Sequence, residues 1–256
     1  MVTDTVVGVR REGLVAIVEL SRSKVNAIDV ELMEQLGSTL DRLEHDPGVG
    51  ALVLTGTGRV FSAGVDLRTV VDAAPGYAER LVTSLRHGLE ALFCFPKPTV
   101  AAVNGAAVAG GCILACACDR RLMADTARIG ASELAVGVPF PVAALEIVRH
   151  ACGSRTEDVV YSARLFDADE ANTIGMIHEV HSPDVLLERA VAVAAEFATR
   201  SPLAYRLAKA QLRGPVLDRM RSAAGALADK TAIDEWAAPH TARNLRQQLE
   251  RLAAAR

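Results

Sequence analysis

Apolar residues along this chain follow two alternating patterns: short continuous runs, and longer stretches in which they recur every three to four positions. Continuous runs are typical of strands buried on both faces, and the longer spacing is typical of helices with one buried face. The alternation predicts an α/β fold with a parallel sheet and crossover helices. The runs predict strands at residues 6–10, 14–20, 51–54, 99–103, 121–124 and 177–180, and the spacing predicts helices from 30 to the break at 47–48, at 77–93, 110–118, 168–174 and 185–199, and directly after Pro141.

The pattern changes near residue 200. Beyond residue 200 only helical spacing is found, and we expect Gly214-Pro215 and Pro239 to break this region into separate helices. We therefore expect a core at residues 1–200 that carries the active site, and a C-terminal helical region at 201–256. Helices without a core of their own must bury their apolar stripes on a neighbouring copy or on the chain's own core, which favours oligomerisation.

The segment around which the chain is organised runs from residue 99 to 120. A β-rich run ends at Asn104-Gly105, and Gly110-Gly111 opens an apolar run that continues to Cys118. This predicts a buried strand, a turn and a buried helix. Unpaired N–H groups at such a glycine start suit a developing oxyanion. Alternatively, the small residues only allow the helix to pack closely.

Composition and charge narrow the class of protein. The chain has 256 residues, 50% of them hydrophobic, and a net charge of −3. This predicts a soluble globular protein with a sizeable core and favours neither nucleic acid nor a membrane surface as a partner. The start of the chain has no secretion pattern, so we expect a cytoplasmic location. Five cysteines with no zinc-type spacing predict reduced core thiols and no metal site.

Three segments resemble the signatures of the crotonase (enoyl-CoA hydratase/isomerase) superfamily. They are Phe61-Ser-Ala-Gly-Val-Asp-Leu67, the run from Ala102 to Cys112, and Cys118-Asp119, which follow in the family order and at the family spacing. The resemblance extends over almost the whole chain. It implies a crotonase-like spiral of ββα units, a C-terminal helical region that builds homotrimers or dimers of trimers, an acyl-CoA thioester as substrate and no other cofactor.

The resemblance also implies roles for particular residues. The backbone N–H groups of Val65 and Gly110 match the family's oxyanion hole, and loss of one such donor typically costs about 2.7–4 kcal/mol. Other positions match groups of residues with a shared role. Lys24, Asn26, Ala27, Ala63 and Arg68 are expected to contact CoA, and Ile113, Leu85 and Phe140 are expected to line the acyl pocket.

One departure from the family pattern concerns the catalytic carboxylates. Hydratases of the family carry two glutamates that hold a water, but here the first position is Ile113 and only the second, Glu133, is retained. Moving a double bond needs a single base that takes a proton from C2 and returns it at C4. Δ3,Δ2-enoyl-CoA isomerases show this pattern, so we expect that activity with Glu133 as the base. An apolar Ile113 should also raise the pKa of Glu133.

Two alternatives remain at this point. One is an enoyl-CoA hydratase that works with Glu133 alone, and the other is a catalytically silent acyl-CoA-binding member of the family. Other polar candidates are interpreted as structural. His178 and His181 need not converge because residues 177–180 are predicted as a strand, His87 is expected on a solvated helix face, and Asp66 and Asp119 are expected to be loop or cap carboxylates.

Overall fold

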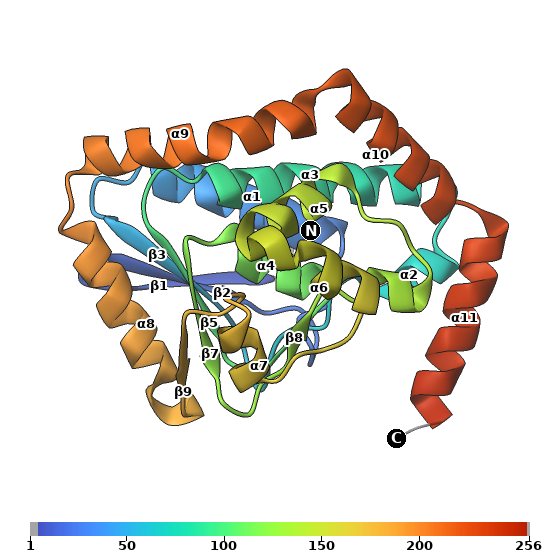
Figure 1. Ribbon diagram of the computed structural model, residues 1–256, viewed down its shortest axis with the longest axis horizontal. Coiled ribbons are helices and arrows are strands. Elements are labelled where there is room, and N and C mark those ends of the chain that lie inside the picture. Colours follow the sequence, from blue (N-terminus) through green and yellow to red (C-terminus); the bar gives the residue numbers. More distant parts are fainter. Residues whose placement is uncertain (1–4, 255–256) are drawn as a thin grey trace.

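A computed structural model describes residues 5–254 and confirms the α/β class (Figure 1). Its larger sheet has six strands in the order β1-β2-β3-β5-β7-β9. Only the first pair is antiparallel; every other neighbouring pair is parallel, as continuous apolar runs predict. The strands are β1 (Val7–Glu12), β2 (Val15–Leu20), β3 (Ala51–Gly56), β5 (Thr99–Val103), β7 (Arg120–Ala124) and β9 (Glu179–His181).

A second, three-stranded parallel sheet in the order β4-β6-β8 was not expected from the sequence. Its strands have two or three residues each, too few to show a periodic pattern. The helix α4 (Gly110–Ala117) contacts β5 of the larger sheet and β4 and β6 of the smaller one. The second sheet thus fixes where α4 begins. Its strands are β4 (Val60–Ser62), β6 (Ala106–Val108) and β8 (Ile129–Gly130).

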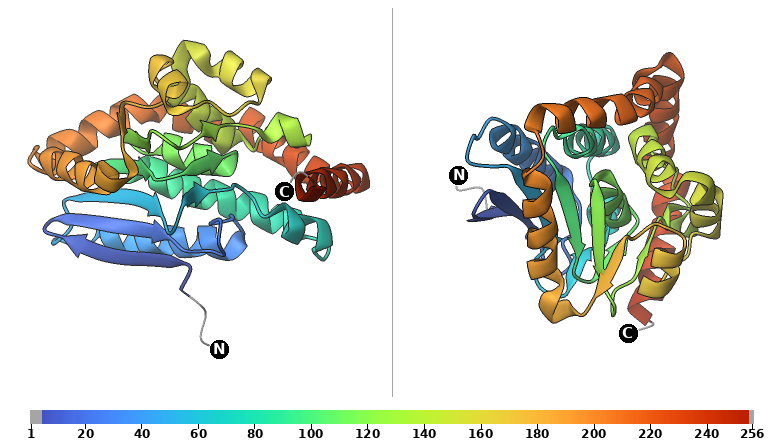
Figure 2. Two further views of the ribbon diagram at one scale, coloured as in Figure 1. Left: turned by 90° about the horizontal axis from the view of Figure 1, so that it is seen from below. Right: turned by 60° about the vertical axis from the view of Figure 1, so that its left-hand side comes forward.

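Helices complete the core. The helix α8 (Pro183–Ala198) packs on β2, β3, β5 and β7, while α1 (Val30–Glu44) pairs with α3 (Tyr77–Cys94) (Figure 2). Asp29 caps α1 by accepting a hydrogen bond from the amide of Leu32. Among the described residues, no helix has the length and apolar composition needed to cross a membrane. The shorter helices are α2 (Leu67–Asp72), α5 (Val142–Cys152), α6 (Thr156–Ser162), α7 (Ala168–Thr173) and the 3₁₀ turns η1 (Glu133–Val136) and η2 (Gly153–Arg155).

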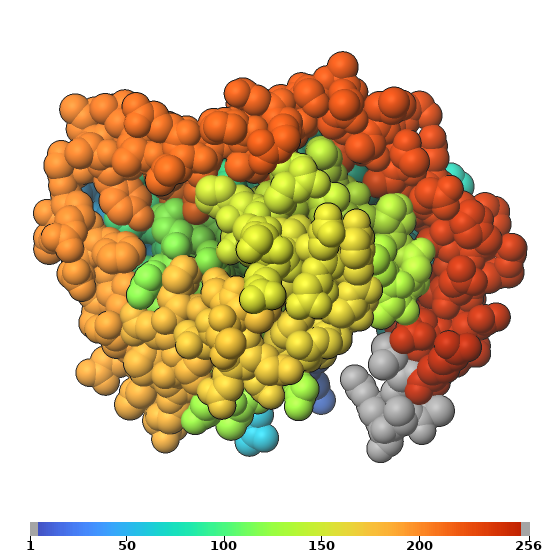
Figure 3. Space-filling view, in the orientation of Figure 1, coloured from blue at the N-terminus to red at the C-terminus, as the bar shows by residue number. Residues whose placement is uncertain are grey.

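The C-terminal region folds back onto its own core. The helices α9 (Pro202–Arg221), α10 (Ala223–Trp236) and α11 (Pro239–Ala254) follow one edge of the molecule (Figure 3). The helix α9 packs on α3 and α5, α10 on the same two helices, and α11 on α2 and η1. The chain's own core therefore buries part of the apolar surface of these helices.

The break predicted at Gly214-Pro215 is wrong, because Pro215 lies inside α9. A proline there removes one helical hydrogen bond and crowds the preceding turn. The helix continues because neighbouring residues on both sides of Pro215, among them Arg213, Val216 and Met220, are buried against the core. The actual break is at Ser222, whose hydroxyl caps α10 by accepting from the amide of Gly225.

Asp119 is more than a loop carboxylate. Its carboxylate accepts from Lys209 Nζ at 2.8 Å and from Arg213 Nη2 at 2.6 Å, and all three side chains are largely buried. Tyr205 also donates its hydroxyl to Asp119, at 2.9 Å. This cluster joins α9 to the end of α4. Partners about 90 positions away cannot be identified from local sequence, which is why the earlier interpretation was incomplete.

Removal of the Asp119 carboxylate should destabilise the fold strongly. We expect Asp119→Ala to lower the free energy of unfolding by about 3–5 kcal/mol, since Lys209 and Arg213 would stay buried without their counter-charge. Chemical denaturation measures this. The exposed carboxylate of Asp125 provides the control, and Asp125→Ala should change stability by less than about 0.5 kcal/mol. Equal losses in the two variants would contradict a structural role for the cluster.

Candidate active site

The backbone amides of Val65 and Gly110 lie close together where α4 begins. A Cβ atom on Gly110 would lie 3.8 Å from the amide nitrogen of Val65, and a Cβ atom on Gly64 would lie 3.3 Å from the amide nitrogen of Gly110. Both amides therefore border one small space. Neither donates a hydrogen bond to another group within residues 5–254. Gly110 is also the first residue of α4, so the partial positive charge of the helix end adds to its N–H.

Unusual backbone conformations hold these amides in place. Gly64 has φ of +80°, and Ala109, directly before α4, has φ of +50° and ψ of −117°. An alanine with positive φ is strained, and such strain persists only where the surrounding structure enforces it. Here, the amide of Ile28 donates to the carbonyl of Gly64, and the amide of Asp66 donates to the carbonyl of Ile28. These bonds fix the loop between β4 and α2 beside the start of α4.

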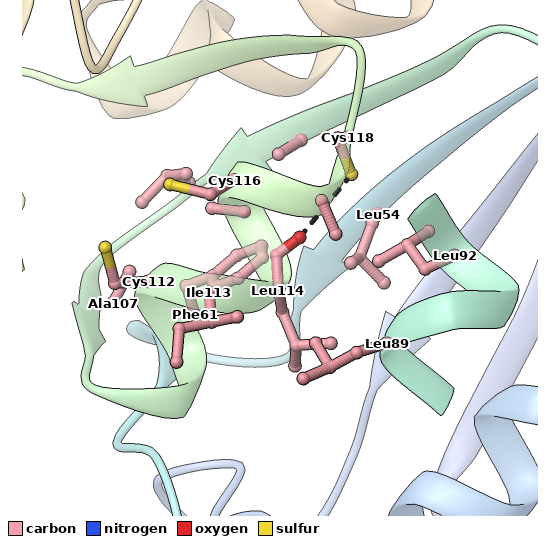
Figure 4. Packing of buried hydrophobic residues seen from close by; sticks show 14 of the residues in the cluster. Leu54, Phe61, Leu89, Leu92, Ala107, Cys112, Ile113, Leu114, Cys116 and Cys118 are labelled. Carbon is pink, nitrogen blue, oxygen red and sulfur yellow. Dashed lines mark hydrogen bonds between the residues drawn. The ribbon is translucent and has the colours of Figure 1, made fainter. Parts of the chain in front are cut away.

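A cavity of about 150 Å³ opens beside the two amides. Its wall combines residues of α1, the loop after β4, α2, α3, β6, α4, η1, α5 and α10, so it is formed by segments far apart in the sequence. Ser132, Glu133 and the indole of Trp236 are the polar side chains among its lining residues. Figure 4 shows two of the lining residues, Leu114 of α4 and Leu89 of α3, which point toward one another, while Cys112 and Cys116 lie on the other side of α4. The cavity suits an apolar ligand.

Glu133 is the one carboxylate that the described part of the chain contributes to this lining. It begins the turn η1 and has only 6% of its surface exposed. Its Oε2 atom is buried and has no hydrogen-bond partner in the described part of the chain. Burial raises the pKa of Glu133 from 4.5 to about 8. A desolvated carboxylate with one oxygen left without a partner is a costly feature that suits a proton-transfer group.

Comparisons with known proteins agree with this arrangement. The family model described as enoyl-CoA hydratase/isomerase matches residues 10–251. The chain belongs to this family. A Thermus thermophilus protein named "putative enoyl-CoA hydratase" is 40% identical over 204 residues, which are 77% of this chain and 80% of that protein. A Rhizobium meliloti protein named "probable enoyl-CoA hydratase" is 34% identical and covers 78% of each chain.

The same family accounts for the fold. The crystal structure of human mitochondrial Δ3,Δ2-enoyl-CoA isomerase superposes with a TM-score of 0.93 at 26% identity, and it covers 98% of this chain and 100% of that one. The crotonase-type architecture predicted from the sequence is thereby confirmed. Some relatives of this chain are named hydratases and one is an isomerase. Membership of the family therefore does not decide which of the two reactions this chain catalyses.

The structure brings together most of the residues predicted for the reacting centre of an enoyl-CoA hydratase/isomerase. Val65 and Gly110 border the cavity with their amides, and Glu133 and Ile113 line it together. Two further predicted contacts, Ala63 and Leu85, are also part of the lining. These residues come from four separate elements or loops, so their meeting in one cavity depends on the family fold.

Phe140 is the one residue predicted for the acyl pocket that is not part of this lining. It lies outside the cavity lining and packs, partly buried, against the core, while Val138 and Pro141 line the cavity in its place. The loop that contains these residues has no regular structure between η1 and α5. Which side chains of an irregular loop face inward cannot be derived from periodicity, and contact between Phe140 and an acyl chain stays a prediction.

Asn26 has a side chain that binds within the protein itself. It is fully buried, and its side-chain amide donates to the carbonyls of Thr57 and Val60. Its own carbonyl accepts from the hydroxyl of Ser62. The side chain of Asn26 therefore holds the loop in shape, and contact between the backbone of Asn26 and CoA stays a prediction.

The other residues predicted to contact CoA lie at the surface. Lys24 and Arg68 are exposed and Ala27 is half-buried. Within residues 5–254, the side chains of Lys24 and Arg68 form no ion pair. Both charges are thus available to an anionic ligand, and their role in CoA binding stays a prediction.

The histidines remain outside the cavity lining. His178 accepts a hydrogen bond from the amide of Arg121, and burial together with Arg121 lowers its pKa to about 4. His181 pairs with Glu179, and His87 lies exposed in the groove between α1 and α3. Sequence reasoning missed Trp236, because no local signal connects a residue of the C-terminal region with a cavity of the core.

Proposed function

We propose that this enzyme moves a double bond from Δ3 to Δ2 of an enoyl-CoA. The observation that carries the proposal is that Glu133 is the one carboxylate among the described residues that line an apolar cavity, and Ile113 is part of the same lining. One base suffices to remove a proton from C2 and return it at C4, whereas hydration also needs a water that is held and activated. The apolar lining disfavours such a water.

The chemistry of the proposed steps follows from the positions of these groups. Ionised Glu133 takes the C2 proton, and the negative charge that develops on the thioester oxygen is stabilised by the amides of Val65 and Gly110. The resulting dienolate is then protonated at C4 by the same glutamic acid. A raised pKa of about 8 makes Glu133 a stronger base toward carbon than an ordinary carboxylate.

A hydratase is the second candidate, and the names of the relatives from Thermus thermophilus and Rhizobium meliloti favour it. The test offers a 3-enoyl-CoA and a 2-enoyl-CoA separately and follows absorbance at equal enzyme concentration. We expect turnover of the 3-enoyl-CoA to be much faster than hydration of the 2-enoyl-CoA. Hydration as fast as isomerisation would replace the proposal by the second candidate.

Activity should depend on pH through Glu133. Because only the ionised form accepts a proton, we expect kcat/KM to rise about tenfold per pH unit below the pKa of about 8 and to level off above it. The same raised pKa stabilises the protonated fold. The contribution of protonated Glu133 to the free energy of unfolding is fully present below pH 4.5 and is lost as the pH rises through about 8.

Steady-state kinetics and denaturation curves between pH 5 and 9 measure both effects. Glu133→Gln is the control for stability, because it should remove this group's share of the pH dependence. A pH-independent kcat/KM between 5 and 9 would contradict the role of a desolvated Glu133 as base.

Replacing Ile113 by glutamate tests what separates the two reactions. A second carboxylate next to Glu133 should hold a water against C3 of a 2-enoyl-CoA, so Ile113→Glu should gain measurable hydration. The variant should also lose about 1–3 kcal/mol of stability through burial of a polar group. Ile113→Gln is the matched control, because glutamine is polar and nearly the same size as glutamate but has no carboxylate that could act as a base. Equal hydration by both variants would show that the second carboxylate is not the discriminating group.

A further inference from the structure

Trp236 is the only tryptophan of the chain and, among the residues that the structure describes, the only one from the C-terminal helices in the cavity lining. It is 5% exposed and ends α10, which packs on α3 and α5. The other lining residues belong to the core that precedes α9. A bulky indole supplied by a separate helix can restrict the space available to a ligand without taking part in the chemistry.

Two contacts fix the indole. Its Nε1 donates to the carbonyl of Pro139 at 3.0 Å, in the loop that contributes Val138 and Pro141 to the cavity. Two turns earlier on the buried face of α10, Asp229 accepts from the amide of Val142 at 2.8 Å. Asp229 thereby supplies the N-terminal cap that α5 lacks, since Pro141 has no capping side chain.

A third contact strengthens this attachment. Arg86 of α3 approaches the Asp229 carboxylate at 3.4 Å, and Asp229 is itself largely buried. Asp229 therefore holds α10 to α3 and α5, and Trp236 holds it to the loop before α5. Trp236 cannot leave the wall without breaking its own hydrogen bond or shifting the helix.

The size of the cavity then indicates which acyl chains fit. We infer that Trp236 limits the acyl capacity of this site, and that the site selects acyl chains of about six carbons, because an apolar cavity of about 150 Å³ holds a benzene-sized group. The inference rests on the proposed function, since it takes the cavity to be the acyl pocket. It makes Trp236 a specificity-determining residue and not a catalytic one.

A longer chain has to displace the indole or leave methylenes in water. Each methylene that a hydrophobic pocket cannot accept changes discrimination by about 10-fold to 200-fold. We therefore expect hexanoyl-CoA to bind at least tenfold more tightly than dodecanoyl-CoA, in spite of the larger apolar surface of dodecanoyl-CoA. In the absence of a size limit, the longer chain would bind more tightly.

The position of the single tryptophan offers a direct measurement. Saturated acyl-CoAs with 4 to about 16 carbons, which cannot react, are titrated into the full-length protein while the fluorescence of Trp236 is followed. We expect a saturable change with the short chains. No change with any acyl-CoA, at concentrations where calorimetry detects binding, would contradict contact between the acyl chain and Trp236.

Variants of Trp236 test the size limit by calorimetry. Trp236→Leu should bind dodecanoyl-CoA at least tenfold more tightly relative to hexanoyl-CoA than the wild type does. Trp236→Phe keeps a ring but lacks the N–H, so it should show a smaller shift. The exposed residue Leu227, 65% accessible on the same helix, provides the control, and Leu227→Ala should leave the ratio unchanged.

The outcomes separate this inference from the proposed reaction. Binding ratios need no turnover, so they decide the role of Trp236 even where the 3-enoyl-CoA assay fails. Equal affinities of wild type for the two chain lengths, or an unchanged ratio in Trp236→Leu, would overturn the inference. If Trp236→Leu does not fold by circular dichroism, the wild-type ratio and Trp236→Phe decide: a wild-type preference for dodecanoyl-CoA contradicts the size limit.

Discussion

Glu133→Gln should lower kcat for a 3-enoyl-CoA by at least about 10²–10⁴-fold, the range typical of a general acid–base group. One carboxylate would serve both proton transfers here, so the loss should reach or exceed that range. The variant should nevertheless fold. Because Oε2 of Glu133 has no hydrogen-bond partner in the described chain, an uncharged amide at this site removes a desolvated carboxylate and breaks no bond to that atom.

Substrate binding and stability supply the controls for this variant. Affinity for a saturated acyl-CoA should stay close to that of the wild type, because Glu133 acts on the proton and not on the CoA. Glu146 is an equally buried carboxylate, but it pairs with Arg149 and Arg219 and lies outside the cavity lining. Glu146→Gln should therefore reduce stability more than kcat. If Glu133→Gln keeps more than half of the wild-type kcat, another group is the base.

The second large effect is expected at Gly64. A side chain at this position would need φ of +80°, and its Cβ would lie 2.6 Å from the carbonyl oxygen of Val108 and 3.3 Å from the amide nitrogen of Gly110. The loop must move away from the start of α4, which separates the two amides. Loss of one oxyanion donor typically lowers kcat by about 10²–10³-fold, so we expect a decrease of this size in Gly64→Ala.

The chain offers a matched control for backbone strain. Gly58 also has positive φ, at +71°, but a Cβ there would have nothing within 4 Å. Both alanine variants carry the conformational cost of a left-handed residue, roughly 1–2 kcal/mol, and only Gly64→Ala disturbs the amides. Steady-state kinetics and thermal denaturation of the two variants separate the effects. A kcat for Gly64→Ala within tenfold of that for Gly58→Ala would mean that the amides do not form the oxyanion site.

Local sequence patterns were sufficient for the main elements. The runs that predict strands at 51–54 and 99–103 lie within β3 and β5, and the helical spacing after residue 30 corresponds to α1, with Asp29 as its cap. Such features depend on residues within a few positions of one another, and burial on one or both faces leaves a period of two or 3.6 residues. The signature segments around Gly64 and Gly110 likewise carry the family assignment without knowledge of any contact.

The tertiary structure decided what depends on distant partners. Strands of two or three residues form the second sheet because they pair with one another, and Pro215 stays inside α9 because the core holds the helix on both sides. Asp119 meets Lys209 from 90 positions away, and Trp236 reaches Pro139 from 97. A short segment does not encode which side chain it will face across the molecule. The sequence alone therefore determined the elements, the family and the candidate base, whereas three-dimensional packing decided the desolvation of Glu133 and the walls of its cavity.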